Sequence, residues 1–291
     1  MKSCPQKETF PVSVVILTLN EEKNLPACLS SVCWAEEIFV VDAGSSDRTN
    51  DIARQFGATV IEHSFESHAA QWRWALENLP LKMEWTLALD ADQRVTPELA
   101  QELGGLDPGE LQGVDGIYIK RRQLFRDQWI KFGGYYPKYL LKLFRAGKVI
   151  IDNRDLVDHH FYVAGNVKKM NHDLIEANKK EDDISFWIEK HNRYATLLAQ
   201  EEYRRKRSPE EPVIKPSLLG TPDQKILILK RIWRRLPLFV RPFLYFFYRY
   251  FVRLGFLDGK EGAIFHFLQA FWFRLLVDIK LDEMHRGESR L

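Results

Sequence analysis

The sequence contains few cysteines, and they form no recognisable metal or disulfide pattern. Only three occur among 291 residues, Cys4, Cys28 and Cys33. They make neither the even set of a disulfide framework nor a Cys-x-x-Cys metal motif. We therefore expect ordinary thiols and a reducing compartment. The first ten residues also lack the apolar run of a secretory signal, so we expect the protein to stay in the cytoplasm.

The chain also lacks the compositional bias of disordered or fibrous proteins. Hydrophobic residues make up 45% and charged residues 28%, which is ordinary for a globular protein. The net charge of +2 gives no reason to expect a nucleic-acid partner. A chain of this length exceeds what one small core needs, so we expect a full catalytic domain and a smaller appendage.

Strands and helices alternate through the first half of the sequence. Continuous apolar runs bounded by turn residues predict strands buried on both faces of a sheet. We expect strands at 12–19, 37–41, 58–61, 84–89, 114–125 and 139–144, and helices near 22–32, 47–56, 69–79 and 185–203. The alternation is typical of parallel βαβ units, so the predicted fold class is α/β, with a mostly parallel, Rossmann-like sheet flanked by helices.

Polar clusters follow three of these strands. Asn20-Glu21 follows the first, residues 42–47 follow the second, and Asp90-Ala91-Asp92 follows the fourth. In an open α/β sheet the carboxyl ends of the strands form the ligand-binding edge, so we expect the three clusters to converge.

The Asp90-x-Asp92 pair suits a hard divalent cation. Mg²⁺ or Mn²⁺ takes one or two carboxylates and completes its shell with water and diphosphate oxygens. An isolated Asp-x-Asp is common on solvated loops. Its position directly after a buried strand favours the metal site instead.

The segment from Asp42 to Asp47 combines a structural and a binding interpretation. Gly44 permits the turn, and Asp47 or Ser46 caps the following helix; we favour Asp47. Asp42 precedes the cap and is expected to point out of the sheet edge. There its carboxylate can accept the imide N–H of a uracil or thymine ring.

With these motifs the chain resembles glycosyltransferase family 2, of the GT-A fold. Residues 18–25, 41–49 and 89–92 are similar to the nucleotide-sugar motifs of that family, in the expected order. The resemblance implies a nucleotide-diphosphate sugar donor, expected to be a UDP-sugar, and inversion of the anomeric centre. It also implies that Thr18, Asn20, Glu21 and Asp42 line the nucleoside pocket, that Asp90 approaches the ribose or the metal, and that Asp92 ligates the metal.

Later segments resemble a bacterial branch of the family, the lipopolysaccharide-core and exopolysaccharide transferases. The resemblance rests on residues 190–195 and 255–260 and implies a glycolipid or saccharide acceptor.

An inverting transfer needs a base that removes the proton of the acceptor hydroxyl. In residues 156–161, where this family keeps a carboxylate, Asp158 is the first candidate. His159 is the second, because it stands where a Glu is expected and an imidazole can also accept a proton. Alternatively, His159 and His160 only pack or bind phosphate.

Acidic residues are missing from part of the C-terminal region. Lys225 to Arg253 contains eight Lys or Arg residues and no Asp or Glu, interleaved with aromatic residues. Within it, residues 236–257 are the only segment that we expect to be long enough to span a membrane, but they contain two prolines and three arginines. The favourable free energy of inserting the apolar side chains into the bilayer and the unfavourable free energy of inserting the arginines roughly cancel.

We therefore expect this region to lie on the membrane as a monotopic anchor. Its arginines would meet anionic headgroups and its phenylalanines would enter the acyl boundary. The apolar stretch at 263–277 has fifteen residues and is expected to be too short to cross ~30 Å of hydrocarbon. It is expected to pack beside the first stretch. A helical hairpin over the sheet or a homodimer contact are the alternatives.

Three parts are predicted: a GT-A catalytic domain at 1–183, an amphipathic helix and linker at 184–223, and a helical membrane-associated region at 224–291. The expected enzyme works on the cytoplasmic face of the inner membrane. A sugar-1-phosphate nucleotidyltransferase would instead need a Gly-rich basic loop after the first strand, where residues 18–25 are acidic. A non-catalytic membrane- or nucleic-acid-binding module would leave the ordered acidic clusters unexplained.

Overall fold

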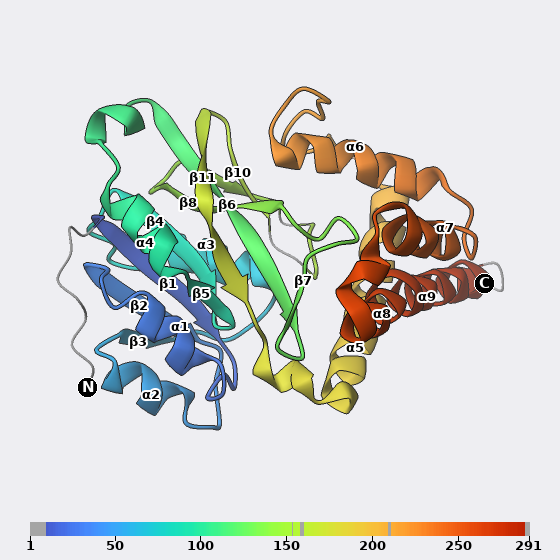
Figure 1. Cartoon of the computed structure of the whole chain (residues 1–291), viewed down its shortest axis with the longest axis horizontal. Coiled ribbons are helices and arrows are strands. Elements are labelled where there is room, and N and C mark those ends of the chain that lie inside the picture. The colour runs from blue at the N-terminus through green and yellow to red at the C-terminus, as the bar shows by residue number, and fades with distance from the viewer. Residues whose placement is uncertain (1–9, 153, 158–159, 209–210, 289–291) are drawn as a thin grey trace.

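A nine-stranded mixed sheet lies at the centre of the molecule (Figure 1). The computed structural model describes residues 10–152, 154–157, 160–208 and 211–288. The strands of the sheet are β1 (Val12–Thr18), β2 (Glu37–Asp42), β3 (Thr59–Glu62), β4 (Trp85–Asp90), β5 (Gln93–Val95), β6 (Val114–Phe125), β7 (Gln128–Ile130), β8 (Lys138–Arg145) and β11 (Asn166–Glu176). Their order is β3-β2-β1-β4-β8-β6-β11-β5, and β7 pairs with β6.

The first four strands of the sheet are parallel, which confirms the predicted α/β class. β1 pairs with β2 and β4, with Thr18 opposite Asp42 and Leu17 opposite Asp90. This register brings the carboxyl ends of the three strands to one edge. β8 then runs antiparallel to β4 and β6, and β11 is parallel to β6. The sheet is therefore more mixed than the sequence pattern predicted.

Helices and a small hairpin cover the two faces of the sheet. One face packs against α1 (Leu25–Ser31) and α4 (Pro97–Gly104) through buried leucines. The other packs against α3 (His68–Asn78) and the hairpin of β9 (Val149–Ile151) and β10 (Phe161–Val163), where Trp72 and Phe144 contact Phe161. α2 (Thr49–Gln55) follows β2. α1 is shorter than predicted, so residues 19–24 are left as a turn at the sheet edge.

Most of the remaining chain is helical and lies beside the sheet, on the right of Figure 1. It comprises α5 (Ile184–Arg207), α6 (Pro222–Arg235), α7 (Arg241–Phe247), a π-helical turn (Tyr248–Val252), α8 (Gly259–His266), a second π-helical segment (Phe267–Trp272) and α9 (Phe273–Glu288). α5 packs along α9 through small and apolar residues such as Ala195, Ala199 and Val277. α8 and α5 also contact the β6–β7 end through Phe265 and Trp187. Most of these helices therefore pack on α5 and on one end of the sheet, while the start of α6 meets one face, where Tyr118 Oη donates to Asp223 at 2.6 Å.

The two apolar stretches differ from their expected structures. Residues 236–257 are not one helix, because Phe239 and Leu254 adopt left-handed backbone angles, with φ of 64° and 60°. Helical turns instead run from Gly255 to Gly287, with Gly259 at a left-handed φ of 66° near their start, and among the described residues this segment alone is long and apolar enough to cross a membrane by length and composition. The expectation that the second stretch is too short, and that only the first is long enough, is therefore wrong.

Two arginines of the basic region contact the interior of the protein, Arg241 fully buried and Arg249 partly buried. The Arg241 guanidinium donates to Asp278 at 2.7 Å and to Glu202 at 2.9 Å, and the Arg241 side chain is 1% exposed. The Arg249 guanidinium lies 4.0 Å from the centre of the Tyr135 ring. The expectation that the arginines of this segment meet lipid headgroups is therefore wrong for these two.

The cysteines also differ from one another. Cys28 is free and fully buried, and burial together with nearby carboxylates raises the pKa of its thiol. Cys33 is disulfide-bonded. The expectation of ordinary free thiols is therefore wrong for Cys33.

Candidate functional site

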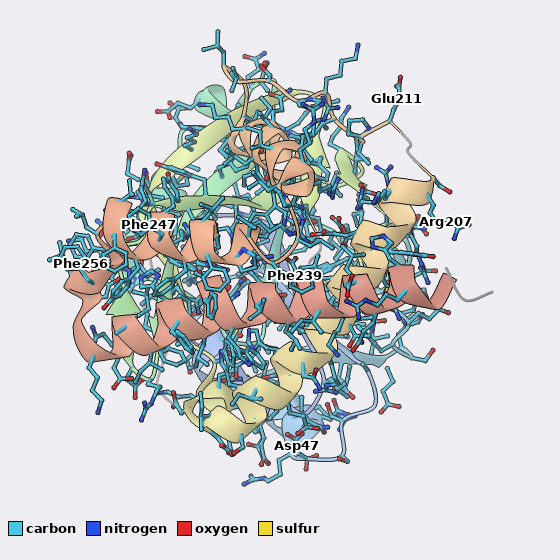
Figure 2. The ribbon with its side chains drawn as sticks, turned by 90° about the vertical axis from the view of Figure 1, so that its right-hand side faces the viewer. Asp47, Arg207, Glu211, Phe239, Phe247 and Phe256 are labelled. Carbon is cyan, nitrogen blue, oxygen red and sulfur yellow. The ribbon has the colours of Figure 1, made fainter. Side chains whose placement is uncertain are left out.

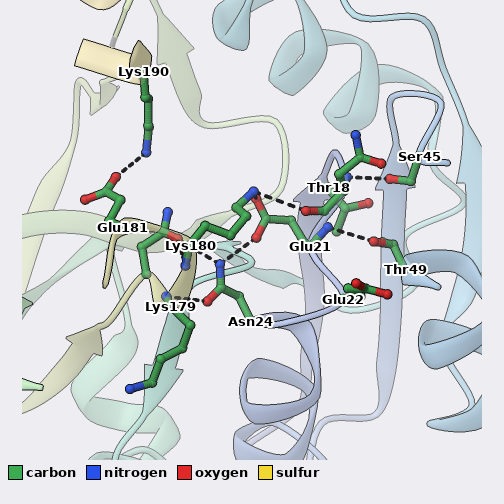
Figure 3. Close-up of polar contacts among 12 residues, drawn as sticks. Thr18, Glu21, Glu22, Asn24, Ser45, Thr49, Lys179, Lys180, Glu181 and Lys190 are labelled. Carbon is green, nitrogen blue, oxygen red and sulfur yellow. Dashed lines mark hydrogen bonds and ion pairs between the residues drawn. The ribbon is translucent and has the colours of Figure 1, made fainter. Parts of the chain in front are cut away.

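The turn after β1 is bound to the loop after β2 (Figure 3). Asn20 adopts a left-handed φ of 54°, and its side-chain oxygen accepts the Ser46 N–H at 2.8 Å. The Asn20 N–H donates to Ser45 Oγ at 2.7 Å, and the Glu21 N–H donates to Thr49 Oγ1 at 2.7 Å. The two loops at the sheet edge therefore hold each other in place.

Asp42 lies beneath these loops and is completely buried. Its Oδ1 accepts from Thr18 Oγ1 at 2.9 Å and from Ser45 Oγ at 2.5 Å. Its Oδ2 accepts the N–H groups of Gly44 and Ser45 at 3.0 and 2.7 Å, and the Asn50 amide at 3.3 Å. A carboxylate offers about four acceptor positions, so this one is fully engaged. The predicted outward orientation of Asp42 is wrong, because its carboxylate organises the loop from inside.

Asp47 supports the start of α2, although it is not the N-cap residue that the sequence predicted. Its Oδ1 accepts the Thr49 N–H at 2.9 Å, and its Oδ2 accepts the Glu22 N–H at 3.1 Å. Partial burial alone would raise the pKa of Asp47, but the hydrogen bonds from Thr49 and Glu22 lower it. The N-cap position itself belongs to Arg48, so Asp47 acts from one residue further back.

A lysine from a distant part of the sequence closes the first turn (Figure 3). Lys180 forms an ion pair with Glu21 and donates to the Asn20 carbonyl at 3.2 Å. Asn24 donates to Glu21 at 2.7 Å and accepts the Lys179 N–H at 2.8 Å. Sequence reasoning missed Lys180, because only the fold brings the segment after β11 to this turn.

Asp90 at the end of β4 is also paired with a lysine. Its Oδ2 lies 2.9 Å from Nζ of Lys142, whose side chain is 5% exposed. Lys142 belongs to β8, the neighbour of β4 in the sheet. The available signal was a charged residue between Leu141 and Leu143, inside the otherwise apolar run of the predicted strand at 139–144.

Asp92 lies among other carboxylates. Burial raises its pKa well above the ordinary value of 3.8, and the charges of Glu176 and Asp90 raise it further. Within the described part of the chain, no side chain forms a hydrogen bond or ion pair with the Asp92 carboxylate. The charge of Lys190 acts in the opposite direction, but its ammonium donates to Glu181 at 2.6 Å. Among the described residues, the Asp92 carboxylate is therefore not directly paired with a positive side chain, and the nearby cations are bound to other carboxylates.

Glu176 and Lys190 complete the surroundings of Asp92. Both oxygens of Glu176 accept from Arg121, at 2.9 and 3.0 Å, and one also accepts from Gln93 at 2.8 Å. Burial alone would lower the pKa of Lys190, but the charges of Glu181 and Asp92 raise it, so the ammonium is retained. Sequence reasoning assigned no role to Glu176 or Glu181, and it used Lys190 only as part of a motif.

A divalent cation fits the chemistry of this edge. No cluster of three or more His, Cys, Asp or Glu ligands is present among the described residues. The chain therefore offers Asp92, with Asp90 beside it, and substrate diphosphate and water would supply the other ligands. A bound cation would also place positive charge beside Asp92, whose pKa is raised by burial and by the charges of Glu176 and Asp90.

The two candidate bases, Asp158 and His159, lie outside the described residues, so their role stays a prediction. Two residues before them, the Leu156 N–H donates to Glu201 of α5 at 3.2 Å. The chain leading to the candidate bases is therefore bound to α5.

The chain matches known proteins in sequence and in fold. A family model described as "Glycosyl transferase family 2" matches residues 13–173. The lipopolysaccharide core biosynthesis glycosyltransferase LpsC of Rhizobium meliloti (strain 1021) is 27% identical over 279 residues, which cover 90% of this chain and 91% of the relative. The undecaprenyl-phosphate 4-deoxy-4-formamido-L-arabinose transferase of Aeromonas hydrophila is 31% identical over 135 residues, covering 41% of this chain and 39% of the relative.

Among solved structures, the mannosyltransferase PcManGT from Pyrobaculum calidifontis, in complex with GDP-Man and Mn²⁺, has a similar fold. The TM-score is 0.50 at 14% sequence identity, and the match covers 95% of this chain and 88% of that chain.

Proposed function

The chain belongs to glycosyltransferase family 2, and from that premise we propose that it is an inverting, metal-dependent enzyme that moves a sugar from a nucleotide-diphosphate sugar to a glycolipid or saccharide acceptor. The observation that carries the proposal is the meeting of three strand ends at one edge. There Thr18 lies opposite Asp42 on β2, and Leu17 lies opposite Asp90 on β4. Family membership also excludes the nucleotidyltransferase and the non-catalytic binding module as the general class.

Asp92 is the proposed metal ligand, with Asp90 at its side. The cation, when bound, neutralises the charge that develops on the diphosphate as it leaves the sugar. Lys190 keeps its positive charge close to Asp92, where it can bind the same phosphates. Lys142 holds Asp90 in a fixed orientation across β4 and β8.

The nucleoside is proposed to bind along the Asn20 turn and the 42–50 loop. The hydrogen bonds between these loops give a rigid surface before the donor arrives. Thr18 and Asp42 support that surface from below. We propose a UDP-sugar as the donor, and Asp158, or alternatively His159, as the base.

The acceptor class is inferred from two relatives. One is named for lipopolysaccharide core biosynthesis and the other for transfer to undecaprenyl phosphate. We therefore propose an acceptor of the lipopolysaccharide, exopolysaccharide or lipid-linked class, presented at the cytoplasmic face of the inner membrane.

An exposed apolar surface supports membrane association. Phe243, Phe247 and Phe251, on α7 and the π-helical turn, are 58%, 57% and 49% exposed, and Val252 and Leu257 are 58% and 52% exposed. Figure 2 shows Phe247 and Phe256 at the outer edge of these helices. Large apolar patches of this kind mark interaction sites. We propose that this surface enters the acyl boundary of an anionic membrane without the chain crossing it.

A transfer assay tests the proposal directly. The full chain is incubated with UDP- and GDP-sugars and with polyprenyl-phosphate or core-saccharide acceptors, and products are identified by mass spectrometry. We expect transfer with Mn²⁺ or Mg²⁺ and none in excess chelator. Asp92→Ala should lower kcat about a hundredfold or more. Asp51→Ala removes an exposed carboxylate of α2 and should have no effect. Full activity in excess chelator would contradict metal dependence.

A further inference from the structure

A cavity of about 180 Å³ lies between α6, the end of α5 and the segment that joins β9 to β10. It is smaller than the roughly 300–1,000 Å³ of sites that enclose a whole small molecule. It therefore has room for one group of a larger ligand. Its charged lining consists of the basic residues Arg154, Arg205, Lys230, Arg231 and Arg234 and the acidic residues Asp152 and Asp155.

The two acidic residues are neutralised by two of the basic ones. Asp152 accepts from the Arg154 side chain at 2.8 Å through each of its oxygens. Burial alone would raise the pKa of Asp152, but these hydrogen bonds and the charge of Arg205 lower it to about 2. Asp155 accepts from Arg205 at 2.8 Å, and its other oxygen lies 3.2 Å from His160 Nδ1. Both carboxylates are therefore already bound by arginines.

The three basic residues that α6 contributes to the cavity have no such partners. Lys230, Arg231 and Arg234 form no ion pair with any residue in the described ranges. The nearest carboxylates on α5 are already engaged, Glu201 by Arg205 at 2.9 Å and Glu202 by Arg241 at 2.9 Å.

Positive charges lie close together in the cavity. Partial burial lowers the pKa of Arg234 and the charge of Arg205 lowers it further, although Glu202, Glu201 and Asp155 act in the opposite direction. The guanidinium groups of Arg205 and Arg234 both line the cavity, and only that of Arg205 is paired with carboxylates in the described residues. An anion placed there would be stabilised by both.

The cavity lies far from the edge where the donor is proposed to bind. Arg205 follows Lys190 by fifteen residues on the same helix, which corresponds to roughly 22 Å along its axis. One small acceptor cannot reach both places, whereas an extended glycolipid can.

The cavity is also next to the apolar surface. α6 exposes Leu229 and Ile232, at 64% and 53%, in the same turns that carry its basic residues. Its last turn contacts α7, with 5.4 Å between the ring centres of Trp233 and Tyr245. A group bound in the cavity would therefore belong to the membrane end of the acceptor.

We propose that this cavity binds a phosphate group at the lipid end of the acceptor while the far end of the glycan reaches Asp92. Phosphate is the expected anion because guanidinium groups bind it in pairs of hydrogen bonds. The inference rests on the proposed glycosyltransfer to a glycolipid. If it holds, the distance between the bound phosphate and Asp92 sets the length of the acceptor that the enzyme can use.

Binding measurements test this inference independently of catalysis. The probes are a bacterial glycolipid with a phosphomonoester and the same glycolipid after phosphatase treatment, both in neutral detergent micelles. The test variant is Lys230→Gln, Arg231→Gln, Arg234→Gln. The matched control removes three exposed charges elsewhere, Arg54→Gln, Lys82→Gln, Lys148→Gln. Melting curves and UDP titration check that both variants fold and keep the donor site.

We expect the original chain and the control to bind the phosphorylated glycolipid more tightly than the treated one. The α6 variant should bind the phosphorylated glycolipid about tenfold more weakly and the treated glycolipid as before, because it lacks hydrogen bonds to a charged group. Equal binding of both glycolipids by the original chain would overturn the inference. So would a loss that appears only with phosphatidylglycerol vesicles, because the cavity would then bind bulk lipid headgroups. If the chain binds as expected but transfers no sugar, the proposed function fails while the phosphate site stands.

Discussion

Lys142 and Asp90 form an ion pair across two neighbouring strands, with 2.9 Å between Nζ and Oδ2. The pair occupies one oxygen of the first aspartate of the Asp-x-Asp motif. Asp90 is therefore restrained by the protein, whereas Asp92 is left as the more available metal ligand.

Removal of this lysine should change metal affinity and turnover in opposite directions. In Lys142→Met, Asp90 is no longer paired and can ligate the metal together with Asp92. The variant also lacks one positive charge that would repel the cation, so we expect Mn²⁺ to bind several-fold more tightly. Turnover should fall because Asp90 is no longer held in place. Calorimetric titration with Mn²⁺ and steady-state kinetics measure the two effects. Weaker Mn²⁺ binding would contradict this assignment of Asp92 and Asp90.

The raised pKa of Asp92 predicts a link between metal and stability. The pKa of Asp92 in the folded state lies above the ordinary 3.8. The protonated carboxyl therefore contributes fully to the stability of the fold at acid pH, and this contribution is lost as the pH rises through the raised pKa. Asn does not titrate, so metal-free Asp92→Asn should have a higher melting temperature than the original chain at neutral pH. The difference should be about 2–4 °C for each kcal/mol of stability that the charged Asp92 costs the original chain. The difference should vanish at acid pH.

Thermal melts with and without Mn²⁺ distinguish this electrostatic effect from a change in packing. Mn²⁺ should raise the melting temperature of the original chain and leave that of Asp92→Asn unchanged. Asp51→Asn, on the exposed surface of α2, serves as the control. A variant that melts lower than the original chain at neutral pH would show that Asp92 is stabilising and not repelled by its neighbours.

The base is tested by separating transfer from donor binding. Asp158→Asn should abolish transfer and leave UDP binding intact, because the base acts on the acceptor hydroxyl. Product formation and UDP titration are measured on the same preparation. An active Asp158→Asn together with an inactive His159→Ala would assign the role to His159.

Membrane binding should depend on both the apolar surface and the basic helix. In flotation with phosphatidylglycerol vesicles, Phe243→Ser with Phe247→Ser should weaken binding at any salt concentration, since both side chains are exposed. Each basic residue near an anionic leaflet contributes about 1 kcal/mol, and salt should weaken that part. Leu218→Ser with Leu219→Ser, in the linker before α6, is the matched control.

Side-specific labelling tests whether the chain crosses the membrane. Residues beyond Gly255 should react with a thiol label only from the side that holds the catalytic domain. Reaction of engineered cysteines after 279 from the opposite side would show that the long helix spans the bilayer.

Local pattern determined the parallel half of the fold. Val12 to Thr18 is apolar enough to be buried on both faces, and each polar cluster begins where such a run ends. Strand ends in a parallel sheet meet at one edge, so the meeting of Asn20, Asp42 and Asp90 followed from the sequence alone. The antiparallel β8 was not predictable in the same way, because its apolar run does not encode the direction of its neighbours.

Only the tertiary structure decided which of these charges are free. The sequence places Asp42, Asp90 and Asp92 at the same edge of the sheet. In the structure Asp42 is enclosed by its own loop, Asp90 is paired with Lys142, and the Asp92 carboxylate has no side-chain partner among the described residues. The same holds for the basic region. Arg241 is buried against Asp278, thirty-seven residues later, while Arg234 faces a cavity. Charge is a property of each residue, but its availability depends on contacts between segments that are distant in sequence. Those contacts depend on how the segments pack in the folded chain, and a local sequence pattern does not specify that packing.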